Sequence, residues 1–275
     1  MKPYIISAFS NPFEANRYWW SLDASLGDSV RPITLMYKNR GKFDKCDIPK
    51  YATVIKADKN YPGNTGRHKD LYNVLKQLEI NKNAWCIFTD VHDVVFQAPL
   101  PKLPEDADVL VCNEGKIFRD IEFWKMKMPK RMWDYPAYNS GVWAMRYSVL
   151  MDYWKSLMNQ WDKFYVWYKT ASLPKIIDQE IYLINVPELD QDIKDRIAMT
   201  FNSYHDTIGF INFLQNKPLR IKEVSGLFAC YAFNYEMGTI YQKEGKTYNQ
   251  NHELVSIVHY NGCFKYKLKE VKTST

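Results

Sequence analysis

The sequence predicts an α/β fold in which a mostly parallel central sheet is flanked by helices. Short apolar runs of the length of buried strands alternate with segments whose apolar residues recur at helical spacing. Two acids, Asp90 and Asp93, lie at the end of one such run, where ligands collect in parallel sheets. With 275 residues and 46% hydrophobic content, the chain can bury a sizeable core. We interpret residues 1–275 as a single domain.

The first half of the chain supplies alternating strands and helices. Apolar runs predict buried strands at residues 4–9, 33–37 and 52–55, and another that begins at Trp85. Apolar side chains at helical spacing predict helices over residues 16–26 and 67–78. In the second of these helices, Leu71, Leu75 and Leu78 share one side. That helix leads directly into the strand before Asp90.

The second half continues this pattern after one irregular segment. Strands are predicted at residues 107–112 and 254–259, and a helix at residues 147–168. Residues 115–135 are rich in Lys, Met and Trp and have no clean period. Two interpretations are equally open: a loop that closes over the site or contacts an acceptor, and an irregular excursion packed by its own aromatic residues. Residues 266–275 form a lysine-rich tail.

The segment from Trp85 to Phe96 (WCIFTDVHDVVF) is the most informative in the chain. Its apolar run is interrupted by Asp90 and Asp93, three residues apart, and then resumes. Holding two carboxylates at the mouth of a buried strand is costly unless a cation or hydrogen bonds compensate. The pattern favours a divalent metal. The alternative is that the two acids only flank a turn.

A second apolar run near the end of the chain supplies a matching pattern. It ends at His259, which Gly262 and Lys265 follow in an H-x-x-G-x-x-K arrangement. Carboxylate oxygens and a neutral imidazole suit Mn²⁺ or Mg²⁺, whereas thiolates would favour zinc. Glycine lets the backbone approach a phosphate, and lysine adds a point charge. Together the two patterns indicate a site for a metal-chelated diphosphate, although a lone histidine is more often a core residue.

Four segments in this order resemble those of GT-A glycosyltransferases, closest to family 8 and to the glycosyltransferase domain of collagen lysyl hydroxylases. They are GRHKDLYNVL (66–75), TDVHDVVF (89–96), YNSGVWAM (138–145) and HYNGCFK (259–265). The D-x-x-D spacing is that of the lysyl hydroxylase group, whereas family 8 usually has D-x-D. The resemblance implies a Rossmann-like GT-A fold, with residues 1–100 binding the nucleotide sugar and residues 101–265 binding the acceptor.

The resemblance also implies roles for individual residues. Those expected to bind metal are Asp90, Asp93 and His259, and those expected to contact the donor or acceptor are Lys69, Asp90, Asn139, Ser140, Gly141, Gly262 and Lys265. His92 is expected either to contact the ribose or to face solvent. Asp178 and Gln179 are the catalytic candidates. Asp178 could act as a general base or lie opposite the leaving group, or it could merely cap a helix.

The expected function is therefore metal-dependent transfer of a sugar from a nucleotide-sugar donor, a UDP-sugar by resemblance, to a hydroxyl acceptor, with Mn²⁺ or Mg²⁺ as cofactor. An inactive binding module and a metal-dependent nucleotidyltransferase or phosphatase are the alternatives. The acceptor could be a protein side chain, a glycan, or a hydroxymethylated base in DNA. A DNA acceptor, kept as an alternative, would fit the net charge of +6 and four basic residues of the irregular segment: Lys125, Lys127, Lys130 and Arg131.

Composition adds an expected location. No stretch of 18 apolar residues exists, and the start of the chain lacks the long apolar region of a signal peptide. The five cysteines are odd in number and form no C-x-x-C pair, which predicts reduced thiols. We expect a cytoplasmic protein. The donor sugar, the stereochemistry of transfer and the oligomeric state are not defined by the sequence.

Overall fold

The structure, a computed structural model, describes residues 1–121, 132–170, 176–177, 180–181, 205–224, 226–231, 234 and 238–260. Its centre is a seven-stranded sheet. The strands are β1 (Tyr4–Phe9), β2 (Arg31–Lys38), β3 (Thr53–Asn60), β4 (Trp85–Thr89), β6 (Val109–Ile117), β7 (Pro136–Arg146) and β10 (Ile221–Lys222). Their order is β10-β6-β7-β4-β1-β2-β3. Only β7 pairs antiparallel with its neighbours, so the predicted mostly parallel sheet is confirmed.

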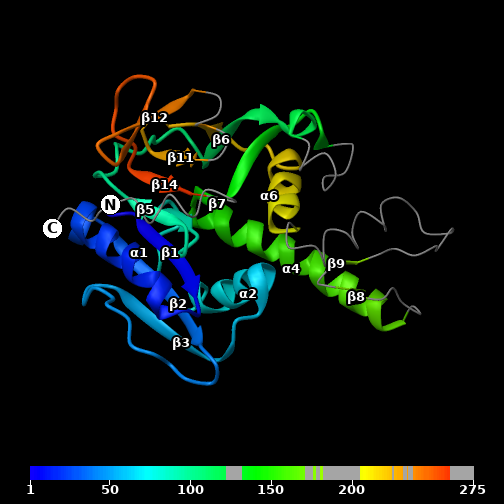
Figure 1. Cartoon of the computed structure of the whole chain (residues 1–275). Helices are drawn as coiled ribbons and strands as arrows, with labels where there is room; N and C mark the ends of the chain where they lie inside the picture. Colours follow the sequence, from blue (N-terminus) through cyan, green and yellow to red (C-terminus); the bar gives the residue numbers. More distant parts are fainter. Residues whose placement is uncertain are drawn as a thin grey trace.

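Helices cover both faces of this sheet (Figure 1). They are α1 (Pro12–Ser25), α2 (Gly63–Leu75), α4 (Tyr147–Thr170) and α6 (His205–Gln215), with short 3-10 helices η1 (Gly27–Ser29) and η2 (Phe118–Asp120). Alternate side chains of β1 point to opposite faces: Ile6 packs in the core shared with α2, α4 and α6, whereas Ile5 packs in the core shared with α1. A strand buried on both sides explains the continuous apolar run of β1.

A smaller sheet lies on the α1 side and carries the end of the described chain. It contains β11 (Phe228–Cys230), β14 (Ile257–His259) and β5 (Val94–Phe96), in that order. The hairpin of β12 (Ile240–Lys243) and β13 (Lys246–Asn249) precedes β14, and β8 (Ile176–Ile177) pairs with β9 (Glu180–Ile181). Because β14 pairs with β5, the last strand of the described residues lies beside the residues that follow Asp93.

Several element boundaries differ from the sequence prediction. Helix α1 begins at Pro12, earlier than predicted, because proline is tolerated in a first helical turn, where its missing N–H has no helical partner. Helix α2 ends at Leu75, so Leu78 lies beyond it, although Leu78 still packs against the core. Strand β3 extends to Asn60 as an exposed edge strand, whose polar half has no apolar signal.

The segment 115–135, for which a loop over the site and an irregular excursion were both open, is partly regular. Its first residues continue β6 to Ile117, and η2 follows. Register shifts in the β6–β7 pairing accompany this extension. Residues 122–131, including the four basic residues at 125, 127, 130 and 131, lie outside the described residues. So does the lysine-rich tail.

Two composition-based expectations concern the chain as a whole. Among the residues that the structure describes, no helix is both long and apolar enough to cross a membrane. Cys46, Cys86, Cys112 and Cys230 are free thiols, and the last three are buried. The fifth cysteine, Cys263, lies outside the described residues.

Candidate metal centre

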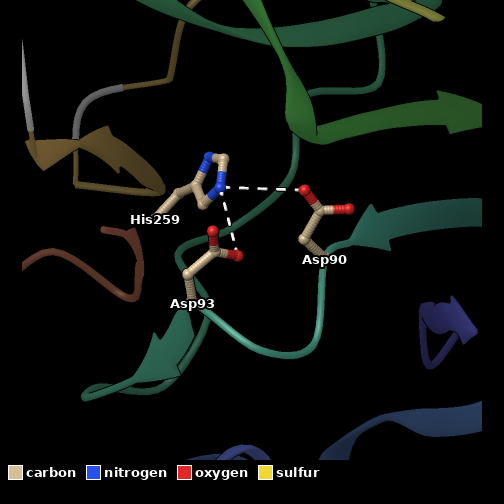
Figure 2. Close-up of side chains that lie close together, drawn as sticks. All are labelled: Asp90, Asp93 and His259. Carbon is tan, nitrogen blue, oxygen red and sulfur yellow. Dashed lines mark ion pairs between the residues drawn. The ribbon is translucent and has the colours of Figure 1, made fainter. Parts of the chain in front are cut away.

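Asp90, Asp93 and His259 converge on one point, as the sequence predicted (Figure 2). One ligand atom from each lies within 4.8 Å of the others. Nε2 of His259 is 3.4 Å from Oδ1 of Asp93 and 3.8 Å from Oδ2 of Asp90. Asp93 and His259 are buried, whereas 26% of the Asp90 side chain is exposed. The cluster is therefore accessible from the side of Asp90.

The strand pairing brings these residues together. Asp90 directly follows β4, at the carboxyl end of the parallel strands, and its N–H donates to the Gly141 carbonyl at 2.8 Å. The β14–β5 register places His259 opposite Val94, and the N–H of Tyr260 donates to the Asp93 carbonyl at 2.7 Å. Backbone hydrogen bonds thus set the positions of both acids and of the histidine.

Asn139 orients the imidazole of His259. The amide oxygen of Asn139 accepts from the N–H groups of Gly141 and Val142, and its Nδ2 donates to Oε1 of Glu114 at 2.8 Å. These partners fix which end of the amide is the oxygen. Nδ1 of His259 lies 3.0 Å from that oxygen and donates to it. This hydrogen bond turns Nε2 toward the carboxylates, as a hydrogen bond to the other ring nitrogen does in metal-binding histidines.

The donor set fits a divalent cation. Two carboxylate oxygens and one imidazole nitrogen suit Mn²⁺ or Mg²⁺, and the number of protein ligands leaves positions for phosphate oxygens. Without a metal, burial alone would lower the pKa of His259, but the neighbouring Asp93 and Asp90 raise it above its ordinary value. The site therefore favours positive charge at this point. A metal bound to Nε2 would take the place of the proton.

Gly141 has no side chain, and His259 and Asp90 occupy the space where one would lie. A Cβ at this position would lie 2.3 Å from Cε1 of His259 and 2.8 Å from Oδ2 of Asp90. No side chain can be accommodated without moving His259 or Asp90. Gly141, expected on the sugar and acceptor side, therefore lines the metal centre itself, within β7. The same applies to Asn139, and residues 139–141 form extended strand.

Three charged residues near the cluster were not predicted: Arg67, Glu114 and Asp206. Nη1 of Arg67 is 2.7 Å from Oδ1 of Asp90, and Nη2 is 3.7 Å from Oδ2 of Asp206. Burial raises the pKa of Asp206 to about 6, although Arg67 opposes the shift. Arg67 could have been found, because it lies on the apolar side of the predicted helix, four residues before Leu71. Asp206 follows no apolar run or motif and gave no signal.

The remaining described candidates are Ser140, His92 and Lys69. Ser140 shares a 2.6 Å hydrogen bond with Thr207 at the start of α6. His92, between the two acids, is exposed. Lys69 is also exposed and lines a pocket of about 270 Å³ between α2 and α4, whereas Arg67 is the basic residue of α2 that contacts Asp90. His68 is buried against Phe88.

Four candidates, Asp178, Gln179, Gly262 and Lys265, lie outside the described residues.

Comparison with known proteins adds no relative, since neither a protein-family model nor a curated protein matches the chain. The function is therefore inferred from the metal centre and its place in the fold.

Proposed function

We propose that this protein is a metal-dependent glycosyltransferase of the GT-A fold, which moves a sugar from a nucleotide-sugar donor to a hydroxyl acceptor. The observation that carries the proposal is the convergence of Asp90, Asp93 and His259 at the carboxyl end of the parallel strands. The sequence resemblance described above points to a UDP-sugar as donor.

The topology supports a nucleotide site next to this cluster. Strand β1 lies between β4 and β2. The chain leaves β1 through α1 to reach β2 on one side, and later leaves β3 through α2 to reach β4 on the other. The strand order therefore reverses between β1 and β4. Such a switch point forms the crevice in which α/β proteins bind nucleotides, and Asp90 directly follows β4.

The residues of the cluster suit the departure of a diphosphate. Asp90, Asp93 and His259 would hold the cation, and Asn139 keeps Nε2 of His259 directed at it. A divalent cation supplies positive charge where the leaving group gathers negative charge as the sugar–phosphate bond breaks. Lys265 is predicted to add a further charge to the diphosphate. Asp178 and Gln179 remain the predicted catalytic residues on the sugar side.

For the acceptor, the proposal specifies only the reacting group, a hydroxyl. A DNA acceptor was suggested by basic residues at 125–131, which the structure does not describe. A nucleotidyltransferase would also use carboxylates at a strand end, but it would act on a nucleoside triphosphate and release pyrophosphate. The H-x-x-G-x-x-K pattern favours the transferase, because it adds a histidine ligand and a lysine near a diphosphate.

Product analysis tests the proposal. The full chain is incubated with Mn²⁺ and a panel of UDP- and GDP-sugars, with and without candidate hydroxyl acceptors, and nucleoside diphosphate release is measured. Parallel reactions contain nucleoside triphosphates with sugar phosphates. We expect nucleoside diphosphate release from at least one nucleotide sugar, and loss of that release with EDTA or in Asp93→Ala.

Two results would overturn the proposal. Pyrophosphate release from a triphosphate, with nucleotide sugars left intact, would identify a nucleotidyltransferase. A protein that binds Mn²⁺ but shows no calorimetric binding of any nucleotide sugar would be neither a transferase of this kind nor a nucleotide-sugar-binding module.

A further inference from the structure

Arg67 is a buried cation that the proposed reaction does not explain. Only 6% of its side chain is exposed, and the guanidinium lies 5.0 Å from the centre of the Phe88 ring. Burying a guanidinium is costly unless carboxylates compensate. Two do so: Asp90, which follows β4, and Asp206, in the first turn of α6. Arg67 thus connects a metal ligand to a carboxylate outside the cluster.

The two oxygens of Asp90 have different partners. Oδ1 contacts Nη1 of Arg67 at 2.7 Å, and Oδ2 faces Nε2 of His259. A planar guanidinium that holds one oxygen restricts rotation of the carboxylate. Oδ2 is then directed at the metal position even before a metal binds. A ligand prepared in this way binds with less loss of entropy.

Asp206 is itself fixed in place. One of its oxygens accepts from the N–H of Thr207 at 2.8 Å, and Thr207 is hydrogen-bonded to Ser140 of β7. The other oxygen faces Arg67. Without Asp206, the guanidinium would keep only one of its two carboxylate neighbours among the described ion pairs. Contacts with Tyr61 and the Phe88 ring would remain, but the attraction of Asp206 for Nη2 would be lost, and the fork could tilt away from Asp90.

We propose that Asp206 is a positioning residue of the metal centre: it holds Arg67 so that Arg67 holds Asp90 in the orientation that binds the cation. Asp206 does not touch the metal position. The inference rests on the metal centre alone and holds whatever reaction the protein catalyses. A purely structural role, in which the ion pair only joins α2 to α6, predicts lost stability without lost metal affinity.

The test is the affinity for Mn²⁺ alone, measured by electron paramagnetic resonance on the full chain at pH 7.5. We expect Asp206→Asn to raise the Kd by about tenfold or more, as is typical of outer-shell partners of metal ligands. Asp206→Glu, which restores the charge, should recover part of that loss. The unfolding free energy of each variant is measured in the absence of metal.

Asp108→Asn is the matched control. The Asp108 carboxylate accepts three hydrogen bonds from Arg220, two of them from the guanidinium, but Asp108 precedes β6 and so lies at the opposite end of the strands from Asp90. The Kd of the Asp108→Asn variant for Mn²⁺ should stay within about twofold of the wild-type value, even where the variant is less stable than the wild type. If Asp206→Asn fails to fold, Arg67→Lys tests the same contact, because an ammonium group cannot hold both carboxylates with a planar fork.

A Kd within twofold of the wild type, in folded Asp206→Asn or in Arg67→Lys, would overturn the inference. Absence of Mn²⁺ binding by the wild type would overturn both it and the metal centre. A shifted Kd without any transfer from nucleotide sugars would leave the inference standing and remove only the proposed function.

Discussion

Asp93 contributes a buried oxygen to the candidate metal site, 3.4 Å from Nε2 of His259. Replacing it with alanine removes one of three protein ligands. We expect Asp93→Ala to weaken Mn²⁺ binding well beyond tenfold and to reduce turnover below about a tenth of the wild type. Calorimetric titration with Mn²⁺ measures the first effect. The exposed Asp28→Ala is the control, and equal affinities for the two variants would show that Asp93 is not a ligand.

Gly141 offers a second test at the residue scale. Because an added Cβ would overlap the His259 ring and Oδ2 of Asp90, Gly141→Ala should displace both ligands and weaken Mn²⁺ binding by at least tenfold. Gly238→Ala is the control for stability: its φ of +67° strains any other residue, but nothing lies within 4 Å. The control should lose stability and keep its metal affinity. Similar metal affinities in the two variants would contradict the predicted overlap.

Asp206 predicts a pH dependence of stability. Its pKa is about 6 in the folded protein and about 4 in an unfolded chain. At a pH between these two pKa values, Asp206 is protonated in the folded state and ionised in the unfolded state. The unfolding free energy therefore falls as pH rises through this range. Between pH 4 and 7 and without metal, the wild type should lose on the order of 3 kcal/mol relative to Asp206→Asn. Denaturant titrations across this range measure the difference, and parallel pH profiles would refute it.

The residues that could be predicted from sequence are those that end an apolar run. Asp90 and His259 each follow or close a buried strand, so their types and places were visible together. Asp206 acts through a contact between α2 and α6, which no local pattern encodes. Arg67 was visible only as a charge on an apolar helix side. Partners of ligands are harder to predict than ligands because they depend on tertiary packing.

At the element scale, β14 carries His259, and Gln97, which follows β5, binds β13 and the segment just before β14. Nε2 of Gln97 donates to the carbonyls of Thr247 and Val255, and its Oε1 accepts from the N–H of Thr247. We expect Gln97→Ala to lower the unfolding free energy by about 2 to 3 kcal/mol, since each lost hydrogen bond costs about 1 kcal/mol. Gln242→Ala, which loses one 3.4 Å contact with Tyr260, should cost less than about 1 kcal/mol.

Chemical denaturation compares these two variants. Equal losses would mean that Gln97 is not what attaches the β12–β13 hairpin to β5. Mn²⁺ affinity should fall less in Gln97→Ala than in Asp93→Ala, because backbone pairing of β14 with β5 still places His259 opposite Val94.

Strands buried on both faces were predicted well, and half-buried ones were not. The run at residues 4–9 gave β1 with its observed limits, because all six residues are buried. The start of β7 alternates between buried and partly exposed positions and carries Asn139 and Ser140, so it was compatible with a turn. Its antiparallel direction depends on neighbours distant in sequence. Direction and edge position are properties of the sheet rather than of the segment.

For the whole molecule, the metal centre joins two parts of the chain that are remote in sequence. Asp90 and Asp93 flank the turn between β4 and β5, and His259 ends β14. An unfolded chain cannot hold these three ligands together, so Mn²⁺ should bind almost only to the folded state. At a Mn²⁺ concentration of 100 times Kd, stability should rise by about 2.7 kcal/mol. Thermal unfolding with and without Mn²⁺ measures this rise. Asp93→Ala should show almost none at the same concentration, and an equal rise in both proteins would place the stabilising metal elsewhere.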